Sequence, residues 1–348
     1  MTPRSSLPFA AAFVALLTVL LVTFNHQKPR LLVLQSYSES GTWERAVDSG
    51  IQRELTRNLR PLRTRWHYMS FSEESMRINW DTAAQHSRSV IDTWRPDVLV
   101  AIGEEAQQYV GRHYAGRTDL RIVYGIGEDP ASFGYADAAN VTGVRETLPL
   151  AQIVELLRYV KGPALRIRAL GVDDPTGRAE RQQVQEFDWG PHRLAGVQLV
   201  ADYPAWQEAV RAAAADADVL LVLSSKGLMR EEGGGQAVSD RELSYWTEHE
   251  SALPAIGVRD SFVAAGGALA VVPSPEALGE QLARQALAAL AGARRGGPLP
   301  PPQDSVDFQI SLRPERLAAR GIQLPTIYEQ AARASHTLYL EGAEAQPR

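Results

Sequence analysis

Beyond residue 29, short runs of aliphatic and β-branched residues alternate with longer segments in which apolar side chains recur every three or four positions. The short runs predict strands and the periodic segments predict helices, so their alternation predicts βαβ units around parallel sheets. The first unit is a strand at 31–35, a polar loop, and a helix with an apolar residue at every fourth position. These apolar residues are Trp43, Val47, Ile51, Leu55 and Leu59.

The same pattern continues along the chain and starts afresh near residue 140. Before that point we expect further strands at 63–69, 97–103 and 121–125. After it, strands are expected at 166–172, 197–202, 219–224, 255–258, 268–273 and 306–312. The helices of this second series are expected at about 150–160, 178–187, 205–215, 275–293, 314–320 and 325–332. The restart predicts two lobes, and 348 residues suffice for two domains with separate cores.

The predicted fold class is therefore α/β, with two lobes built on doubly wound parallel sheets and one hydrophobic helix before them. The expected segments are an N-terminal hydrophobic segment (1–29), a first lobe (30–143, to which about 275–300 returns), a second lobe (144–274), a C-terminal strand and helices that complete the fold (301–335), and a loose tail (336–348).

The run from Phe9 to Phe24 contains no charged residue and predicts a membrane-targeting segment. As a helix it would span about 24 Å, somewhat less than the hydrocarbon core of about 30 Å. No small-residue cleavage pattern follows the run, and the chain has no cysteine for lipid attachment. We therefore expect an uncleaved anchor, and a cleaved signal peptide is the alternative.

Charge and motifs exclude several classes of function. The net charge is −5 with both signs interspersed, so no broad basic surface for nucleic acid is expected. The chain lacks a G-x-S-x-G elbow, a P-loop, an H-E-x-x-H motif and an EF-hand loop. The one tight cluster of histidine and carboxylates, Glu248-His249-Glu250, is expected to be a solvated helix face. We predict no enzymatic activity, no catalytic residue, no metal site and no cofactor.

Ligands of doubly wound sheets bind at the carboxyl ends of the strands, so the loops after the predicted strands are the places to look. After the first strand, Ser36, Tyr37, Ser38 and Trp43 offer hydroxyl groups and aromatic rings for hydrogen bonding and stacking. The alternative for this loop is structural: its hydroxyls cap the following helix while Trp43 packs in the core.

The next strand ends of the first lobe carry acidic residues. Gly103 and Glu104 follow the third strand, where a carboxylate also stabilises a helix N-terminus. Glu128 and Asp129 follow the fourth strand in the sequence GIGEDP. Proline stands there in place of the last glycine of G-x-G-x-x-G, so we reject a nucleotide site.

Equivalent strand ends of the second lobe supply further candidates. They are Asp173, Ser224, Ser225 and Arg259, together with Ser274 at the return to the first lobe. Each can line a ligand cleft, and each can equally cap a helix. The candidate ligand-binding residues of the whole chain are thus spread over both lobes.

Several motifs follow one another in the order and spacing of a known family. They are Ser36-Tyr37 with Trp43 and Gly50-Ile51, Tyr68-Met69, Pro96-Asp97-Val98-Leu99-Val100, Ile122-Val123-Tyr124 with Asp129-Pro130, Asn140-Val141-Thr142-Gly143-Val144, and Gly321-Ile322 with Pro325. Through these motifs residues 30–335 resemble the ABC-transporter substrate-binding-like family, which has the type I periplasmic binding fold. The opening motif is most similar to that of the extracytoplasmic domain of membrane-bound sensor members.

The resemblance implies two lobes that are joined by hinges near 140–145 and 273–275 and close on a small ligand. Two positions depart from the sensor pattern: Ser38 stands where those members often carry His, and Ser70 where they often carry Asp. The ligand therefore differs from theirs, or the site is degenerate.

These observations predict an extracytoplasmic protein that captures a small solute, amino acid or peptide-like, for an ABC permease. The alternative is a membrane-anchored sensory subunit that passes ligand occupancy to a separate signalling protein. In both cases the resemblance implies an N-terminal anchor in the bacterial cytoplasmic membrane and the bulk of the chain in the periplasm. If the N-terminal segment is cleaved, the protein is secreted to the periplasm instead.

Overall fold

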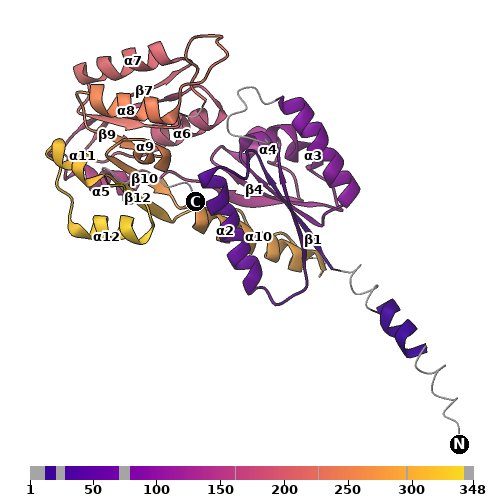
Figure 1. The fold of residues 1–348 in the computed structure, drawn as a ribbon. Coiled ribbons are helices and arrows are strands. Elements are labelled where there is room, and N and C mark those ends of the chain that lie inside the picture. The colour runs from indigo at the N-terminus through magenta and orange to yellow at the C-terminus, as the bar shows by residue number, and fades with distance from the viewer. Residues whose placement is uncertain are drawn as a thin grey trace, which may run out of the picture.

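The computed structural model describes residues 12–20, 28–69, 79–160, 162–225, 227–294 and 297–340, which form two α/β lobes after a short N-terminal helix over 12–20 (Figure 1). Within these described ranges no helix has both the length and the apolar character needed to cross a membrane. Of the predicted anchor at 9–24, the structure describes the helix over 12–20; residues 9–11 and 21–24 lie outside the described ranges, as do Ser70 and the tail from 341.

The first lobe contains a parallel six-stranded sheet in the order β11-β5-β4-β3-β1-β2. Its strands are β1 (Arg30–Gln35), β2 (Arg63–Tyr68), β3 (Val98–Ile102), β4 (Arg121–Ile126), β5 (Val141–Arg145) and β11 (Gln303–Asp304). Its helices are α2 (Thr42–Arg57), α3 (Trp80–Trp94), α4 (Glu104–Tyr109) and α10 (Pro275–Arg294), with 3-10 turns η1 (Gly111–Tyr114) and η2 (Pro130–Phe133). Successive side chains of β1 point to opposite faces and are buried on both, because α2 and α10 cover one face while α3 and α4 cover the other (Figure 1).

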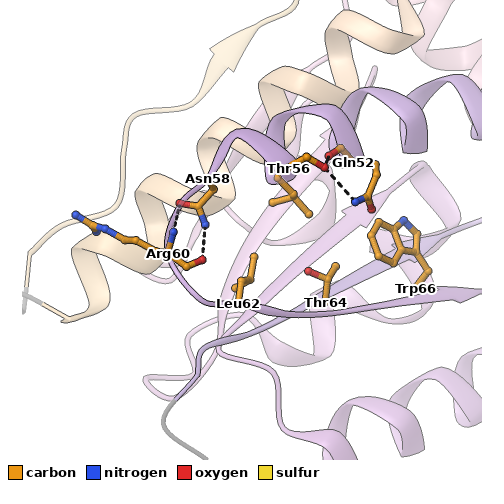
Figure 2. Close-up of a pocket in the computed structure, with 8 residues that line it drawn as sticks. Gln52, Thr56, Asn58, Arg60, Leu62, Thr64 and Trp66 are labelled. Atoms are coloured by element: carbon orange, nitrogen blue, oxygen red, sulfur yellow. Dashed lines mark hydrogen bonds between the residues drawn. The ribbon is translucent and has the colours of Figure 1, made fainter. Parts of the chain in front are cut away.

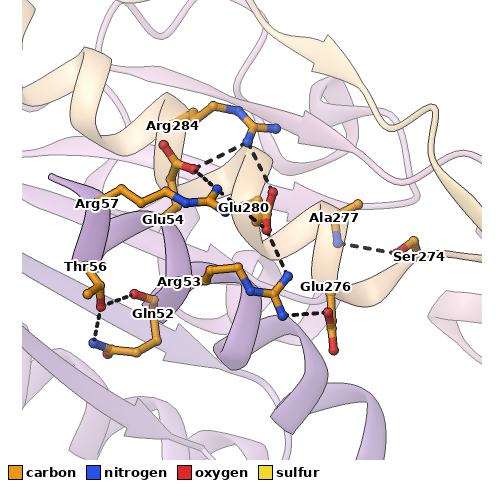
Figure 3. Close-up of polar contacts among 10 residues, drawn as sticks. All are labelled: Gln52, Arg53, Glu54, Thr56, Arg57, Ser274, Glu276, Ala277, Glu280 and Arg284. Atoms are coloured by element: carbon orange, nitrogen blue, oxygen red, sulfur yellow. Dashed lines mark hydrogen bonds and ion pairs between the residues drawn. The ribbon is translucent and has the colours of Figure 1, made fainter. Parts of the chain in front are cut away.

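Helices α2 and α10 pack with their backbones in close approach. A Cβ atom at Gly50 would lie 2.0 Å from the Glu276 carbonyl oxygen, and one at Gly279 would lie 2.0 Å from that of Val47. Glycine is therefore required at both positions. Ion pairs that include Arg53 with Glu276, at 2.8 Å, border this contact on the solvent side (Figure 3).

The second lobe contains a six-stranded sheet in the order β12-β10-β9-β8-β6-β7, in which β12 is an antiparallel edge strand. Its strands are β6 (Arg166–Val172), β7 (Arg193–Val200), β8 (Val219–Val222), β9 (Ala255–Gly257), β10 (Leu269–Pro273) and β12 (Phe308–Leu312). Its helices are α5 (Leu150–Leu157), α6 (Pro175–Glu186), α7 (Tyr203–Ala212), α8 (Asp240–Glu250), α9 (Asp260–Ala264), α11 (Pro314–Ala319) and α12 (Thr326–Ala334), with the 3-10 turn η3 (Ala213–Ala215). The predicted fold class, two doubly wound α/β lobes, is confirmed.

The chain crosses between the lobes after β5, after β10 and after β11. The crossing segments are hydrogen-bonded to one another: the Thr147 N–H donates to the Ser305 hydroxyl at 3.0 Å, and the Ser274 N–H donates to the Asp307 carbonyl at 3.0 Å. The first two crossings lie where the resemblance implied hinges. The third, between β11 and β12, was not among the expectations.

The expectation that Glu248, His249 and Glu250 form a solvated face is wrong for Glu248. This residue of α8 is 5% exposed. Its carboxylate pairs with the Arg320 guanidinium and accepts from the Ala268 N–H at 3.2 Å. The polar sequence of α8 conceals this burial, because the partner Arg320 lies far along the chain.

Candidate ligand-binding site between the lobes

The loop after β1 is fixed to the start of α4. The Ser36 hydroxyl donates to the Ile102 carbonyl at 2.9 Å and accepts from the Ala106 N–H at 3.0 Å. Gly103 has φ +92°, and a Cβ atom there would lie 2.4 Å from the Ser36 Oγ. The sequence can make this close approach because position 103 is glycine. The carboxyl ends of β1 and β3 therefore form one rigid unit.

Tyr37 and Glu105 come together on this unit. The Tyr37 hydroxyl donates to Glu105 Oε1 at 2.9 Å. Burial, and then the negative charge of Glu105, raise the pKa of Tyr37 far above its usual range, so the hydroxyl stays a donor. The Tyr37 ring lies edge-on to Trp80, with 6.0 Å between centroids, and Trp80 stacks on Tyr109 at 5.7 Å.

Glu104 points to the neighbouring strand end. Its Oε1 accepts from the Gly127 N–H, just after β4, at 2.8 Å. Burial, followed by the charges of Glu105 and Glu146, raises the pKa of Glu104 to about 7. Near neutral pH this carboxyl is therefore poised between its charged and neutral forms.

The second lobe contributes an ion cluster centred on Arg259, the residue before α9. Arg259 NH1 lies 2.8 Å from Glu146, on the first crossing segment, and NH2 lies 2.6 Å from Glu180 of α6. Glu180 also accepts from the Ser224 N–H at 2.6 Å. Burial by itself lowers the pKa of Arg259, but Glu146 and Glu180 outweigh it and raise the pKa.

Helix α6 links this ion cluster to the first lobe. The Gln183 amide donates to the carbonyl oxygens of Gly127, at 3.1 Å, and Glu146, at 3.0 Å. Asp174, which caps α6 through the Gly177 N–H at 2.6 Å, has its pKa raised to about 6 by burial and then by Glu180 and Glu105. Helices α4 and α6 thus face each other from opposite lobes (Figure 1). We call this group of polar side chains the interlobe cluster; it contains Tyr37, Glu104, Glu105, Glu146, Asp174, Glu180, Gln183 and Arg259.

The structure brings some of the predicted site residues to the interlobe cluster. They are Ser36, Tyr37, Gly103, Glu104, Ser224 and Arg259. Ser225 is half-buried next to Ser224, and Glu128 is half-buried one residue beyond Gly127. A ligand-binding role for all of these residues stays a prediction.

Other predicted residues make structural contacts elsewhere. Trp43 packs against the core under α2 and α10. The Ser38 hydroxyl bonds to that of Ser40 at 2.9 Å. Two more lie at helix starts: Asp129 caps η2, and Ser274 Oγ accepts from the Ala277 N–H at 3.4 Å. Asp173 forms an exposed ion pair with Arg178 at 2.8 Å.

Sequence reasoning missed Glu105, Glu146, Glu180 and Gln183. Glu105 stands beside Glu104 in the first turn of α4, and nothing in the local sequence distinguishes the two carboxylates. Glu180 and Gln183 belong to a polar helix, and the available signal was that Gly177, Glu180 and Val184 recur at helical spacing on one face. That spacing predicts a buried side for α6 but does not name its partners.

One surface pocket lies away from the interlobe cluster. It is lined by Gln52, Leu55, Thr56, Asn58, Arg60, Leu62, Thr64 and Trp66 (Figure 2). These residues lie at the end of α2 and along β2, beginning at the amino end of that strand. Because ligands of such sheets bind at the carboxyl ends of strands, this pocket is not the candidate site.

No family model and no curated protein matches the sequence. Solved structures do match the fold. A conserved domain protein from Vibrio cholerae has a TM-score of 0.63 and 19% identity, covering 88% of this chain and 98% of that one. An ABC domain in complex with L-Trp from Streptococcus pneumoniae has a TM-score of 0.61 and 17% identity, covering 88% and 98%.

A third structure is the ligand-free, open form of a substrate-binding protein with adhesive properties from Clostridium difficile. It has a TM-score of 0.61 and 14% identity and covers 91% of this chain and all, 100%, of that one. At these identities the likeness shows the fold. The chain has the two-lobe fold of type I periplasmic binding proteins, as the sequence motifs predicted.

Proposed function

We propose that this chain is an extracytoplasmic solute-binding protein that captures a small ligand between its lobes for an ABC-type uptake system. The observation that carries the proposal is the interlobe cluster. Buried ionisable groups from both lobes converge at the carboxyl ends of their strands, where proteins of this architecture bind ligands. The L-Trp complex of one similar structure and the substrate-binding description of another support the same role.

We assign the chain no enzymatic activity. Two carboxylates of the interlobe cluster are held by groups that account for their positions. Glu104 accepts from the Gly127 N–H, and Glu180 is neutralised by Arg259. Closing two lobes on a ligand requires such rigid polar walls but no reacting group.

A thermal-shift series on the full-length protein tests ligand capture. A ligand at one hundred times its Kd stabilises the native state by about 2.7 kcal/mol. For a chain of 348 residues that unfolds as one unit, this corresponds to a rise in Tm of roughly 4 °C. We expect such a rise with an amino acid or a short peptide. If amino acids, peptides, sugars and inorganic anions all leave Tm unchanged, solute capture is refuted.

We further propose that residues 9–24 form an uncleaved anchor in the cytoplasmic membrane, with both lobes in the periplasm. The uncharged run and the lack of a cleavage pattern support this proposal. Mass spectrometry of the protein recovered from the membrane fraction is the test. A mature N-terminus between residues 20 and 30 would instead establish a cleaved signal peptide.

A second candidate function is a sensory subunit that reports ligand occupancy to a signalling partner. The opening motif Ser36-Tyr37 with Trp43 and the proposed anchor favour it. Reconstitution separates the two: a transport protein stimulates the ATPase of its permease when liganded, whereas a sensory subunit changes the activity of a kinase or cyclase. Genes for one or the other class of partner beside this gene give the same answer.

A further inference from the structure

Glu105 carries a buried carboxylate oxygen that the protein leaves unbonded. The residue is 6% exposed. Its Oε1 accepts from the Tyr37 hydroxyl, while Oε2 has no hydrogen-bond partner among the residues that the structure describes. Buried polar atoms are nearly always paired, and an unpaired charged one is costly. Oε2 therefore has an acceptor position to offer.

The surroundings of Glu105 add negative charge. Glu104 lies beside it in α4, and Asp174 faces it from the second lobe; the charge of Glu105 contributes to the raised pKa of both groups. The nearby guanidinium groups are already engaged: Arg259 lies between Glu146 and Glu180, and Arg178 pairs with Asp173. The vacant acceptor thus lies in a region where carboxylates outnumber cations.

Aromatic side chains border the same position. Tyr37 touches Glu105 through its hydroxyl, and its ring continues into the stack of Trp80 and Tyr109. Aromatic faces attract cations and pack against apolar groups. An acceptor oxygen beside aromatic rings suits an ammonium group that is attached to an apolar or aromatic body.

We propose that the ligand of the interlobe cluster carries a protonated amine, which donates to Glu105 Oε2 and is neutralised from the opposite lobe by Asp174. This inference rests on the proposed function and specifies its ligand class. It also supplies a cause for closure. Glu105 and Asp174 repel each other across the lobes, and an ammonium ion between them turns that repulsion into attraction for both.

The test is calorimetric titration of the full-length protein with matched pairs of probes. Each pair contains an amino acid and its deaminated analogue: L-tryptophan with indole-3-propionate, and L-leucine with 4-methylpentanoate. Tryptamine, which keeps the amine and lacks the carboxylate, and glucose complete the set. We expect binding by amine-bearing probes and none by the deaminated analogues or glucose.

Glu105→Gln is the decisive variant, because it keeps the shape and removes the charge. We expect it to weaken binding of the amine-bearing probe by about 30-fold or more, as the loss of a buried charge pair does. Glu39→Gln, an exposed carboxylate on the neighbouring loop, is the matched control and should leave affinity unchanged. The ligand-free Glu105→Gln protein should melt no lower than the wild type, because a repulsive charge has been removed.

The outcomes separate this inference from the proposed function. Equal binding of deaminated analogues or of glucose, or an unaltered affinity in Glu105→Gln, overturns the amine proposal while solute capture stands. Absence of binding by every probe, together with no thermal shift in the wider series, overturns both. Loss of binding in Glu39→Gln equal to that in Glu105→Gln would show a general charge effect and overturn the specific contact.

Discussion

Replacement of Arg259 should lower the free energy of unfolding far more than replacement of an exposed arginine that also pairs with two carboxylates. The Arg259 side chain is 25% exposed and lies between carboxylates that are 9% and 2% exposed. Arg259→Met leaves Glu146 and Glu180 buried without their counter-ion. Breaking a buried pair in this way costs about 3–5 kcal/mol. Arg53, which is 43% exposed and pairs with Glu276 and Glu280, provides the control (Figure 3).

Equilibrium unfolding in urea, followed by circular dichroism, measures both variants. We expect Arg53→Met to lose no more than about 1 kcal/mol, because exposed pairs contribute little. Adding Glu180→Gln to Arg259→Met removes one uncompensated charge and should restore part of the loss, whereas Glu280→Gln should restore none. Equal losses for the two single arginine variants, or no rescue by Glu180→Gln, would refute the role assigned to Arg259.

Three further predictions concern other parts of the molecule. Gly279→Ala places a Cβ atom 2.0 Å from a backbone oxygen of α2 and should cost about 1–3 kcal/mol or more in urea unfolding, whereas Gly235→Ala, with open space around it, should cost under about 1 kcal/mol. Because the pKa of Glu104 is raised from 4.5 to about 7, about 3 kcal/mol of stability that is present below pH 4.5 is lost as the pH rises through 7. Glu104→Gln should flatten the dependence of the free energy of unfolding on pH over this range. Identical pH dependence in the variant and the wild type would contradict the burial argument. Tyr37→Phe should weaken ligand binding, measured by calorimetry, by about 10-fold, because Glu105 loses the donor that orients it. It should also lower the free energy of unfolding by about 1–3 kcal/mol, because the buried Glu105 Oε1 is left unpaired; an unchanged affinity would contradict the orienting role.

The sequence predicts the fold well where strands are buried on both faces. Strands β1, β3 and β4 contain the apolar runs 31–34, 98–102 and 122–126, which are bounded by polar or glycine residues and indicate short strands covered on both faces. The sequence predicts the fold poorly where tertiary contacts override the local pattern. Strand β11 has two exposed residues, Gln303 and Asp304, and no hydrophobic signal, so the third crossing between the lobes could not be expected.

In the candidate site too, some residues follow from the local sequence, whereas others depend on tertiary contacts. The rule that ligands bind at strand ends led to Ser36, Tyr37, Glu104 and Arg259 without any structure. It could not distinguish Glu104, whose Oε1 accepts a hydrogen bond from the Gly127 N–H, from Glu105, whose Oε2 has no partner among the described residues. That difference depends on the neighbouring strand and on the opposite lobe, and neither is encoded in the local sequence.

Hydrogen exchange with and without ligand tests most directly whether a solute binds between the lobes. The compound that raises Tm most is added to the full-length protein, and peptides are compared by mass spectrometry. Binding in the interlobe cluster predicts simultaneous protection of 36–43 and 103–109 in the first lobe and of 173–183 in the second. Protection confined to one lobe, or to the pocket between α2 and β2 (Figure 2), would contradict it.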